Sequence, residues 1–194
     1  MSWLTILRKR NAYRKTFYGF DINKVAAMTQ DDVQKILDTT PTSNSNSDNK
    51  NDIVVRHKGK IESIIHNARC IQQMRNQEQK RKQQEDDDDD DNYGVFDKFI
   101  WSFIDDKPII KKKKKNDINT DNRKDIIANS TSPESYAMSN ALKKQWGFKF
   151  VGPTTCYSMM QSIGMVIDHP FGSQEWKLAY ERLKKRPNGY QYKD

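Results

Sequence analysis

Apolar residues recur along most of the chain at intervals of three and four, the spacing that places side chains on one face of a helix. These stripes are, in chain order, Trp3, Ile6 and Leu7; Tyr13 and Phe17; Val33, Ile36 and Leu37; Ile61, Ile64, Ile65, Ala68 and Ile71; Phe96, Phe99, Ile100 and Phe103; Met138, Ala141, Leu142 and Trp146; Cys156, Met159, Met160 and Ile163; and Trp176, Ala179, Tyr180 and Leu183. No convincing run of alternating apolar and polar residues competes with them. The pattern predicts an all-α fold.

Polar residues at the start of several stripes support these helices. Thr29 with Asp32 has the spacing of a capping box, in which each residue satisfies a free amide of the first turn. Ser132 followed by Pro133 is typical of an N-cap and a first helical residue, and Ser173 is a possible cap of the last stripe.

Three polar tracts interrupt the helical pattern, at residues 39–52, 76–92 and 111–125. The second contains six aspartates, Asp86 to Asp91, and the third begins with Lys111 to Lys115. None has enough apolar surface to offset the chain entropy of folding, so we expect disordered loops. We favour solvated filler over a binding tail for both charge runs.

The composition indicates the class of binding partner and the cellular compartment. A net charge of +8 and a pI of about 9.3 favour a polyanionic partner, nucleic acid before an anionic membrane surface. Only two cysteines occur, Cys70 and Cys156, without a CxxC spacing, which suits a reducing compartment. No apolar run is long enough to span a membrane, and no signal peptide precedes Trp3. We therefore expect an intracellular protein, in the nucleus of a eukaryote or the cytoplasm otherwise.

The turn at residues 147–155 is the most informative local feature. Gly147 directly follows the last apolar residue of its stripe, where a glycine C-cap belongs. Gly152 and Pro153 lead into the next predicted helix, whose first turn contains Thr154 and Thr155. Backbone amides gathered at such a turn suit a phosphate oxygen, while a plain corner between two helices has the same spacing.

Four ordered blocks of sequence decide between these interpretations. They are "SWLTILRKRNAYRKTFYGFDINKVAAM" (2–28), "RHKGKIESIIHNAR" (56–69), "FIWSF" (99–103) and "SNALKKQWGFKFVGPTTCYSMMQSIGMVIDH" (139–169). The chain resembles the DNA-3-methyladenine glycosylase I family, a branch of the helix-hairpin-helix DNA glycosylases. The resemblance implies that residues 147–155 form the hairpin that grips DNA. The residues expected to contact DNA are Lys143, Lys144, Gly147, Lys149, Val151, Gly152, Thr154 and Thr155.

The family resemblance also implies a reaction. Proteins of this family remove 3-methyladenine from DNA as monofunctional glycosylases, after the lesion has left the base stack. Trp3 matches the family's tryptophan that stacks on the cationic base. The alternative for Trp3 is a core tryptophan, because it shares a stripe with Ile6 and Leu7. No lysine nucleophile is expected.

The N-terminal part of the resemblance is incomplete. In the family a further segment precedes this block and supplies a glutamate that recognises the base, other aromatic residues and part of a structural zinc site. This sequence begins at Met1, so we expect that glutamate to be missing, with Asp168 as the nearest substitute acid. His169 matches a family zinc ligand, but Ser173 stands where a cysteine is expected, so we expect no bound zinc and no other cofactor. His57 and His66 are not assigned to a metal.

These expectations define one domain and three competing functions. Residues 1–173 form a glycosylase-like helical domain with polar insertions at about 39–52, 76–92 and 111–125, and residues 174–194 form a helical extension. We expect a monomer that acts on double-stranded alkylated DNA and not on a membrane. The alternatives are a non-catalytic DNA-binding remnant or an incomplete chain of the same family, and a generic helical interaction protein.

Overall fold

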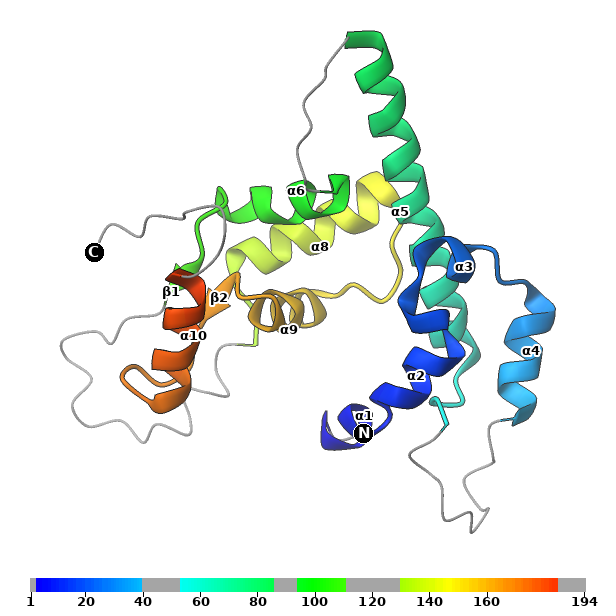
Figure 1. Ribbon diagram of the computed structural model, residues 1–194, viewed down its shortest axis with the longest axis horizontal. Coiled ribbons are helices and arrows are strands. Elements are labelled where there is room, and N and C mark those ends of the chain that lie inside the picture. Colours follow the sequence, from blue (N-terminus) through cyan, green and yellow to red (C-terminus); the bar gives the residue numbers. More distant parts are fainter. Residues whose placement is uncertain (1–2, 40–52, 86–93, 111–129, 185–194) are drawn as a thin grey trace. The chain divides into compact units, whose positions relative to one another are not determined.

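The computed structural model describes residues 3–39, 53–85, 94–110 and 130–184 (Figure 1). These residues belong to two compact units. The first comprises Met1–Asp90 with Trp146–Phe150, and the second comprises Asp91–Gln145 with Val151–Asp194. Nearly all described elements are helices, so the predicted all-α fold is confirmed. No helix within the four described ranges is both long enough and apolar enough to cross a membrane.

The first unit is built on one long helix. Its elements are α1 (Trp3–Arg8), α2 (Arg10–Thr16), the short 3-10 turn η1 (Tyr18–Phe20), α3 (Ile22–Ala26), α4 (Gln30–Thr39) and α5 (Lys58–Glu85). Both α3 and α4 pack on α5. The buried residues of this core are Ala12, Phe17, Val25, Ala26, Met28, Val33, Val54, Ile61, Ile65 and Ala68. The core therefore joins the predicted stripes of α2, α4 and α5.

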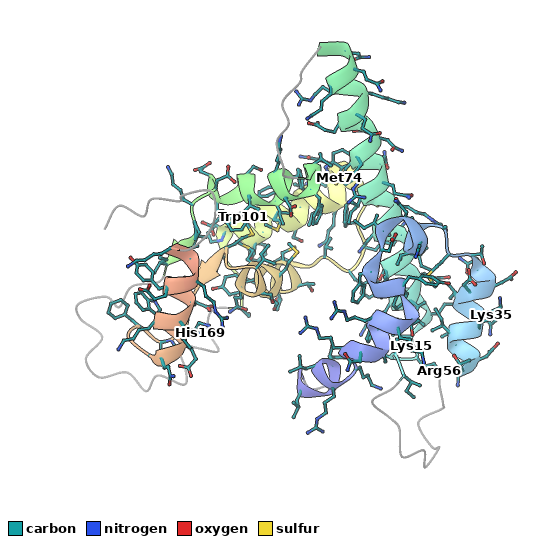
Figure 2. All side chains as sticks on the ribbon, viewed as in Figure 1. Lys15, Lys35, Arg56, Met74, Trp101 and His169 are labelled. Atoms are coloured by element: carbon teal, nitrogen blue, oxygen red, sulfur yellow. The ribbon has the colours of Figure 1, made fainter. Side chains whose placement is uncertain are left out.

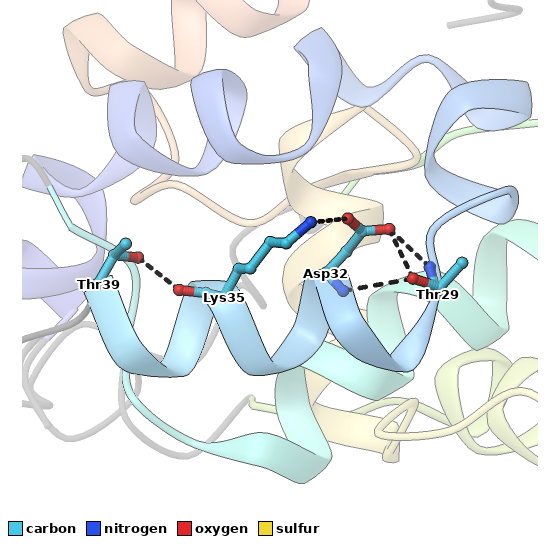
Figure 3. A network of polar contacts seen from close by, with 4 residues as sticks. All are labelled: Thr29, Asp32, Lys35 and Thr39. Atoms are coloured by element: carbon cyan, nitrogen blue, oxygen red, sulfur yellow. Dashed lines mark hydrogen bonds and ion pairs between the residues drawn. The ribbon is translucent and has the colours of Figure 1, made fainter.

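Local polar contacts fix where these helices begin. The capping box at α4 is confirmed: the Thr29 amide donates to Asp32 Oδ2 at 2.8 Å, and the Asp32 amide donates to Thr29 Oγ1 at 3.3 Å (Figure 3). The hydrogen bond from the Thr29 amide, together with one from the Thr29 hydroxyl to Asp32 Oδ2 at 3.0 Å, lowers the pKa of the Asp32 carboxyl. Asp21 caps α3 by accepting a hydrogen bond from the Lys24 amide at 3.0 Å.

The prediction of disorder for residues 76–92 is wrong over its first ten residues. Helix α5 continues without a break to Glu85, well beyond its last fully buried side chain, Met74. Gln, Lys, Arg and Glu are good helix formers, and extending an existing helix needs no new nucleus. An ion pair of 2.9 Å between Arg81 and Glu78 adds local support. Thr39 ends α4, while the rest of the three polar tracts lies outside the described residues.

The second unit contains α6 (Val95–Trp101), η2 (Ser102–Ile104), β1 (Ile109–Ile110), α8 (Pro133–Trp146), α9 (Pro153–Ser162), β2 (Val166–Ile167) and α10 (Gln174–Lys184). The two-residue strands pair in parallel, with Ile109 opposite Val166. Two predicted caps are confirmed. Ser132 Oγ accepts a hydrogen bond from the Ser135 amide at 3.2 Å, and Ser173 Oγ accepts one from the Trp176 amide at 3.1 Å.

Candidate nucleic-acid interface

The glycine predicted to end α8 does so. Helix α8 ends at Trp146, and Gly147 adopts a φ of +71°, in the left-handed region that favours glycine. Of the two residues that follow Gly147, Phe148 is buried and Lys149 is exposed. Phe150 has a φ of +58° and is 55% exposed, and its ring makes an edge contact with His57, with 6.2 Å between ring centroids. The segment 147–150 is therefore an ordered turn with one aromatic side chain facing solvent.

Two neighbouring side chains of α5 hold this segment by its backbone. His66 Nε2 lies 2.9 Å from the Gly147 carbonyl oxygen. Asn67 makes two contacts with Lys149: its Nδ2 donates to the Lys149 carbonyl oxygen at 3.0 Å, and its Oδ1 accepts from the Lys149 amide at 2.9 Å. One side-chain amide thus pairs with Lys149 as a neighbouring peptide would. The Lys149 amide is already hydrogen-bonded to Asn67, so the exposed group of Lys149 is its side chain.

In the second unit, buried groups hold the start of α9. Ser139, which is fully buried, donates from Oγ to the Val151 carbonyl oxygen at 2.6 Å. The Cys156 thiol lies 3.7 Å from the same oxygen, and burial raises the pKa of this thiol. The Cys156 amide donates to the Gly152 carbonyl oxygen at 2.9 Å. These contacts fix the two residues that precede the helix.

The first turn of α9 has the free amides that the sequence predicts. Gly152 is its N-cap residue and provides no side-chain acceptor, and Pro153 has no amide hydrogen. The amides of Thr154 and Thr155 stand in the first turn, where no helical carbonyl precedes them. Both threonines are exposed. This helix start can donate hydrogen bonds to an anion.

Lysines accompany both parts of the predicted interface. Lys143 and Lys144 are exposed in the last turn of α8, and Lys149 is exposed in the segment 147–150. Within the described part of the chain, no carboxylate lies within ion-pairing distance of these three lysines. Their charges are therefore available to an external anion.

Trp3 is the first residue of α1, and its side chain lies outside the described structure. Its proposed stacking on a base therefore stays a prediction. The rest of the α1 stripe is not buried: Ile6 is 42% exposed and Leu7 is 44% exposed. Burial along this stripe gives no support to a core role for α1.

Asp168 lies directly after β2 and is held by two donors from α9. The Tyr157 hydroxyl and Gln161 Nε2 each donate to Asp168 Oδ2 at 2.8 Å. Burial of Tyr157, helped by the hydrogen bond to Asp168, raises the pKa of its hydroxyl above the usual value. The contacts of Asp168 serve the join between α9 and β2, and its role as a substitute acid stays a prediction.

The next residue, His169, is exposed (labelled in Figure 2). Ser173, at the position where the family resemblance implies a cysteine ligand, is used as the α10 cap. Among the described residues, no three His, Cys, Asp or Glu side chains gather in a geometry that could hold a metal. The donors described here do not fit a structural zinc site, which normally has four protein ligands.

A cavity of about 280 Å³ lies in the first unit, between α5 and the segment that contains η1 and α3. It is lined by Phe20, Ile22, Val25, Ile64, Asn67, Ala68 and Ile71. Asn67 therefore borders an apolar cavity while it holds the backbone of Lys149.

Comparison with known proteins identifies the group to which this fold and hairpin belong. The family model described as methyladenine glycosylase matches residues 1–175. The chain belongs to the methyladenine glycosylase family.

Individual methyladenine glycosylases agree with this assignment. The chain is 38% identical over 172 residues to DNA-3-methyladenine glycosylase 1 of Escherichia coli (strain K12), covering 89% of this chain and 72% of the relative. It is 36% identical over 170 residues to the DNA-3-methyladenine glycosylase of Haemophilus influenzae, covering 87% and 71%.

Solved structures of methyladenine glycosylases match the fold as well. One of 3-methyladenine DNA glycosylase I has a TM-score of 0.63 and 35% identity, covering 90% of this chain and 75% of that chain. Another, of a variant in complex with 3-methyladenine, has a TM-score of 0.62 and 30% identity, covering 90% and 74%. The whole of the hairpin lies in the matched region, whereas α10 continues to Lys184, beyond the family match.

Sequence reasoning missed the side chains that hold the hairpin in place. His66 and Asn67 contact residues more than 80 positions away, and no local pattern gives such pairs. One signal was present: two adjacent polar residues follow Ile64 and Ile65 on the most apolar stripe of the chain. Polar groups in such a place need partners.

Proposed function

We propose that this protein is a DNA-3-methyladenine glycosylase that hydrolyses the bond between the damaged base and its deoxyribose in double-stranded alkylated DNA. The observation that carries the proposal is the identity of 38% and 36% with two relatives of that name, each covered to more than two thirds of its length. A solved relative with 3-methyladenine bound supports the same substrate.

The chemistry of the lesion sets what the protein must supply. Methylation at N3 makes the adenine nucleotide cationic, which weakens the glycosidic bond and makes the base a good leaving group. The base must first leave the stack, and a damaged base costs less to extrude than a sound one. Water then attacks the sugar carbon, so no lysine nucleophile is needed. We assign Trp3 to stack on the extruded base, where cation–π attraction contributes up to about 2 kcal/mol.

Binding to the duplex is assigned to residues 147–155 and the lysines beside them. The amides of Thr154 and Thr155 at the start of α9 donate to a phosphate, and Gly152 allows the backbone to approach it. Lys143, Lys144 and Lys149 add the counterion release that makes DNA binding depend on salt. Such contacts carry no sequence information, as a repair enzyme that scans DNA requires.

We assign to Asp168 the role of the acid that assists departure of the base. A carboxylate near the cationic base stabilises the positive charge that develops on the sugar. Because the described donors do not fit zinc, we propose that no step uses a metal. We further propose that the protein acts as a monomer, in the nucleus of a eukaryotic host or the cytoplasm of a bacterial one.

One observation favours a second candidate, a DNA-binding protein of this family without catalysis. Asp168 Oδ2 already accepts two hydrogen bonds, from Tyr157 and Gln161, so this carboxylate also has a structural task. The test is release of free 3-methyladenine from a methylated duplex, measured together with duplex affinity. Release above the uncatalysed rate supports the glycosylase, and duplex binding without release supports the second candidate.

A further inference from the structure

The first helices of the chain carry positive charge without any negative charge. Residues 3–20 contain Arg8, Lys9, Arg10, Arg14 and Lys15, and the first acidic residue of the sequence is Asp21. All of this segment belongs to the first unit. The proposed hairpin contacts do not involve these five basic residues, so the hairpin does not account for their function.

Helix α2 sorts these charges onto one face. Ala12 and the C-cap residue Phe17 are buried, which fixes the side of α2 that packs against the core. On the opposite side, the exposed residues are Arg10, Asn11, Arg14 and Lys15 (Lys15 is labelled in Figure 2). These four residues are called the α2 basic face below. It contains three cations, one neutral amide and no apolar side chain.

The cations of this face lack the partners that two other cations of the first unit have. The Lys9 ammonium donates to the Ile53 carbonyl oxygen at 2.7 Å, and its partial burial lowers the pKa of Lys9. Lys35 pairs with Asp32 at 3.9 Å. By contrast, none of the carboxylates in the described ranges pairs with Arg10, Arg14 or Lys15.

An unpaired basic face on one helix has an energetic consequence. Arg10 and Arg14 are four residues apart, so two like charges are neighbours on the helix surface and destabilise it slightly. A polyanion removes that repulsion. The rise between the two residues along α2 is about 6 Å, so both guanidinium groups can reach phosphates of the same strand. Arginine suits phosphate because its planar group donates two parallel hydrogen bonds.

We propose that the α2 basic face is a second DNA-binding surface, which contacts backbone phosphates independently of the hairpin residues 147–155. This inference rests on the proposed action on DNA and adds to it a site that the hairpin does not include. An anionic membrane is the competing partner, because Leu4, Ile6 and Leu7 of α1 are exposed. DNA is favoured because an interfacial helix inserts an apolar face, and the exposed side of α2 has none.

The test is the salt dependence of duplex binding by the full chain. The variant is Arg10→Gln with Arg14→Gln. The control is Lys35→Gln with Arg81→Gln, which removes the same charge from two residues that pair with Asp32 and Glu78. Each lost phosphate contact lowers the slope of log K against log salt by about 1. Between about 50 and about 200 mM salt, the wild type should therefore lose about 16-fold more affinity than the variant.

The expected result is a slope reduced by about 2 in the Arg10/Arg14 variant, equally on alkylated and unmodified duplex, and little changed in the control. Arg10→Lys with Arg14→Lys keeps the charge and should keep the slope, which separates charge from folding. An unchanged slope in the glutamine variant overturns the inference, and the proposed function survives if Gly152 variants still lose affinity. Binding to phosphatidylserine vesicles that depends on Arg10 and Arg14, with the duplex slope unchanged, also overturns it. A wild type that binds no duplex overturns both.

Discussion

Gly147 and Gly152 are both glycines of the hairpin, but they meet different requirements. Gly147 has a φ of +71°, which a residue with a side chain adopts only at a cost. Gly152 has a φ of −66°, and a Cβ added there would meet no atom within 4 Å. The fold thus explains the first glycine, whereas no contact within the described structure requires the second.

This difference gives a paired prediction. Gly147→Ala should lower the free energy of unfolding by about 1 kcal/mol because of its left-handed backbone. Gly152→Ala should change it by less than about 0.5 kcal/mol, since the altered cap and the reduced chain entropy oppose each other. The affinity of the Gly152→Ala variant for any duplex should nevertheless fall, because the added methyl group separates the backbone from a phosphate. Chemical unfolding and duplex titration measure the two effects, and unchanged duplex affinity in Gly152→Ala would remove the close approach at this residue.

Trp3 belongs to the other half of the proposed site, the recognition of the base. Trp3→Ala should weaken binding of free 3-methyladenine by roughly tenfold, because stacking of a base on an aromatic side chain contributes about 1–3 kcal/mol. Duplex affinity should change little, because phosphate contacts dominate it. Titration with the free base and with duplex measures the two affinities. A large loss of thermal stability with base binding retained would instead assign Trp3 to the core.

At the level of elements, short-range chemistry in the sequence predicted where helices begin and end. Thr29 with Asp32, Ser132, Ser173 and Gly147 all have the predicted roles, because caps depend on residues within one turn. The prediction of disorder is wrong for the first ten residues of the tract 76–92, which are helical although they lack apolar side chains. Helix propensity and an existing nucleus at the apolar half of α5 decided the structure there.

The candidate site was predictable only where its parts are local. The turn at 147–155 follows from glycine, proline and threonine chemistry, but its anchoring on α5 does not. Side-chain contacts between residues far apart in sequence depend on how the helices pack, which one sequence does not specify.

The anchoring makes a prediction at this scale. Asn67→Ala removes both hydrogen bonds to Lys149, so the segment 147–150 must be ordered when DNA binds. That ordering costs about 1 kcal/mol, or about fivefold in duplex affinity. Fluorescence anisotropy with a labelled duplex measures the change.

The matched control is Ile71→Ala, which alters the cavity that Asn67 also borders and leaves Lys149 untouched. If the control weakens duplex binding as much as Asn67→Ala does, the cavity and not the hairpin anchor is responsible. Equal affinity of Asn67→Ala and the wild type would show that the hairpin needs no anchor.

For the whole molecule, the feature to explain is the net charge of +8. Part of the +8 comes from the run Lys111 to Lys115, which lies outside the described residues. Among the described cations without a carboxylate partner are three on the α2 basic face and, beside the hairpin, Lys143, Lys144 and Lys149. We propose that counterion release from these two surfaces makes a duplex the preferred partner.

The most direct test of the account is release of free 3-methyladenine from a methylated duplex by the full chain, followed by chromatography of the released base. The account predicts release well above the spontaneous rate at low salt, lower release by Trp3→Ala, and slower release as salt weakens duplex binding. Duplex binding with release no faster than in a protein-free control would contradict it.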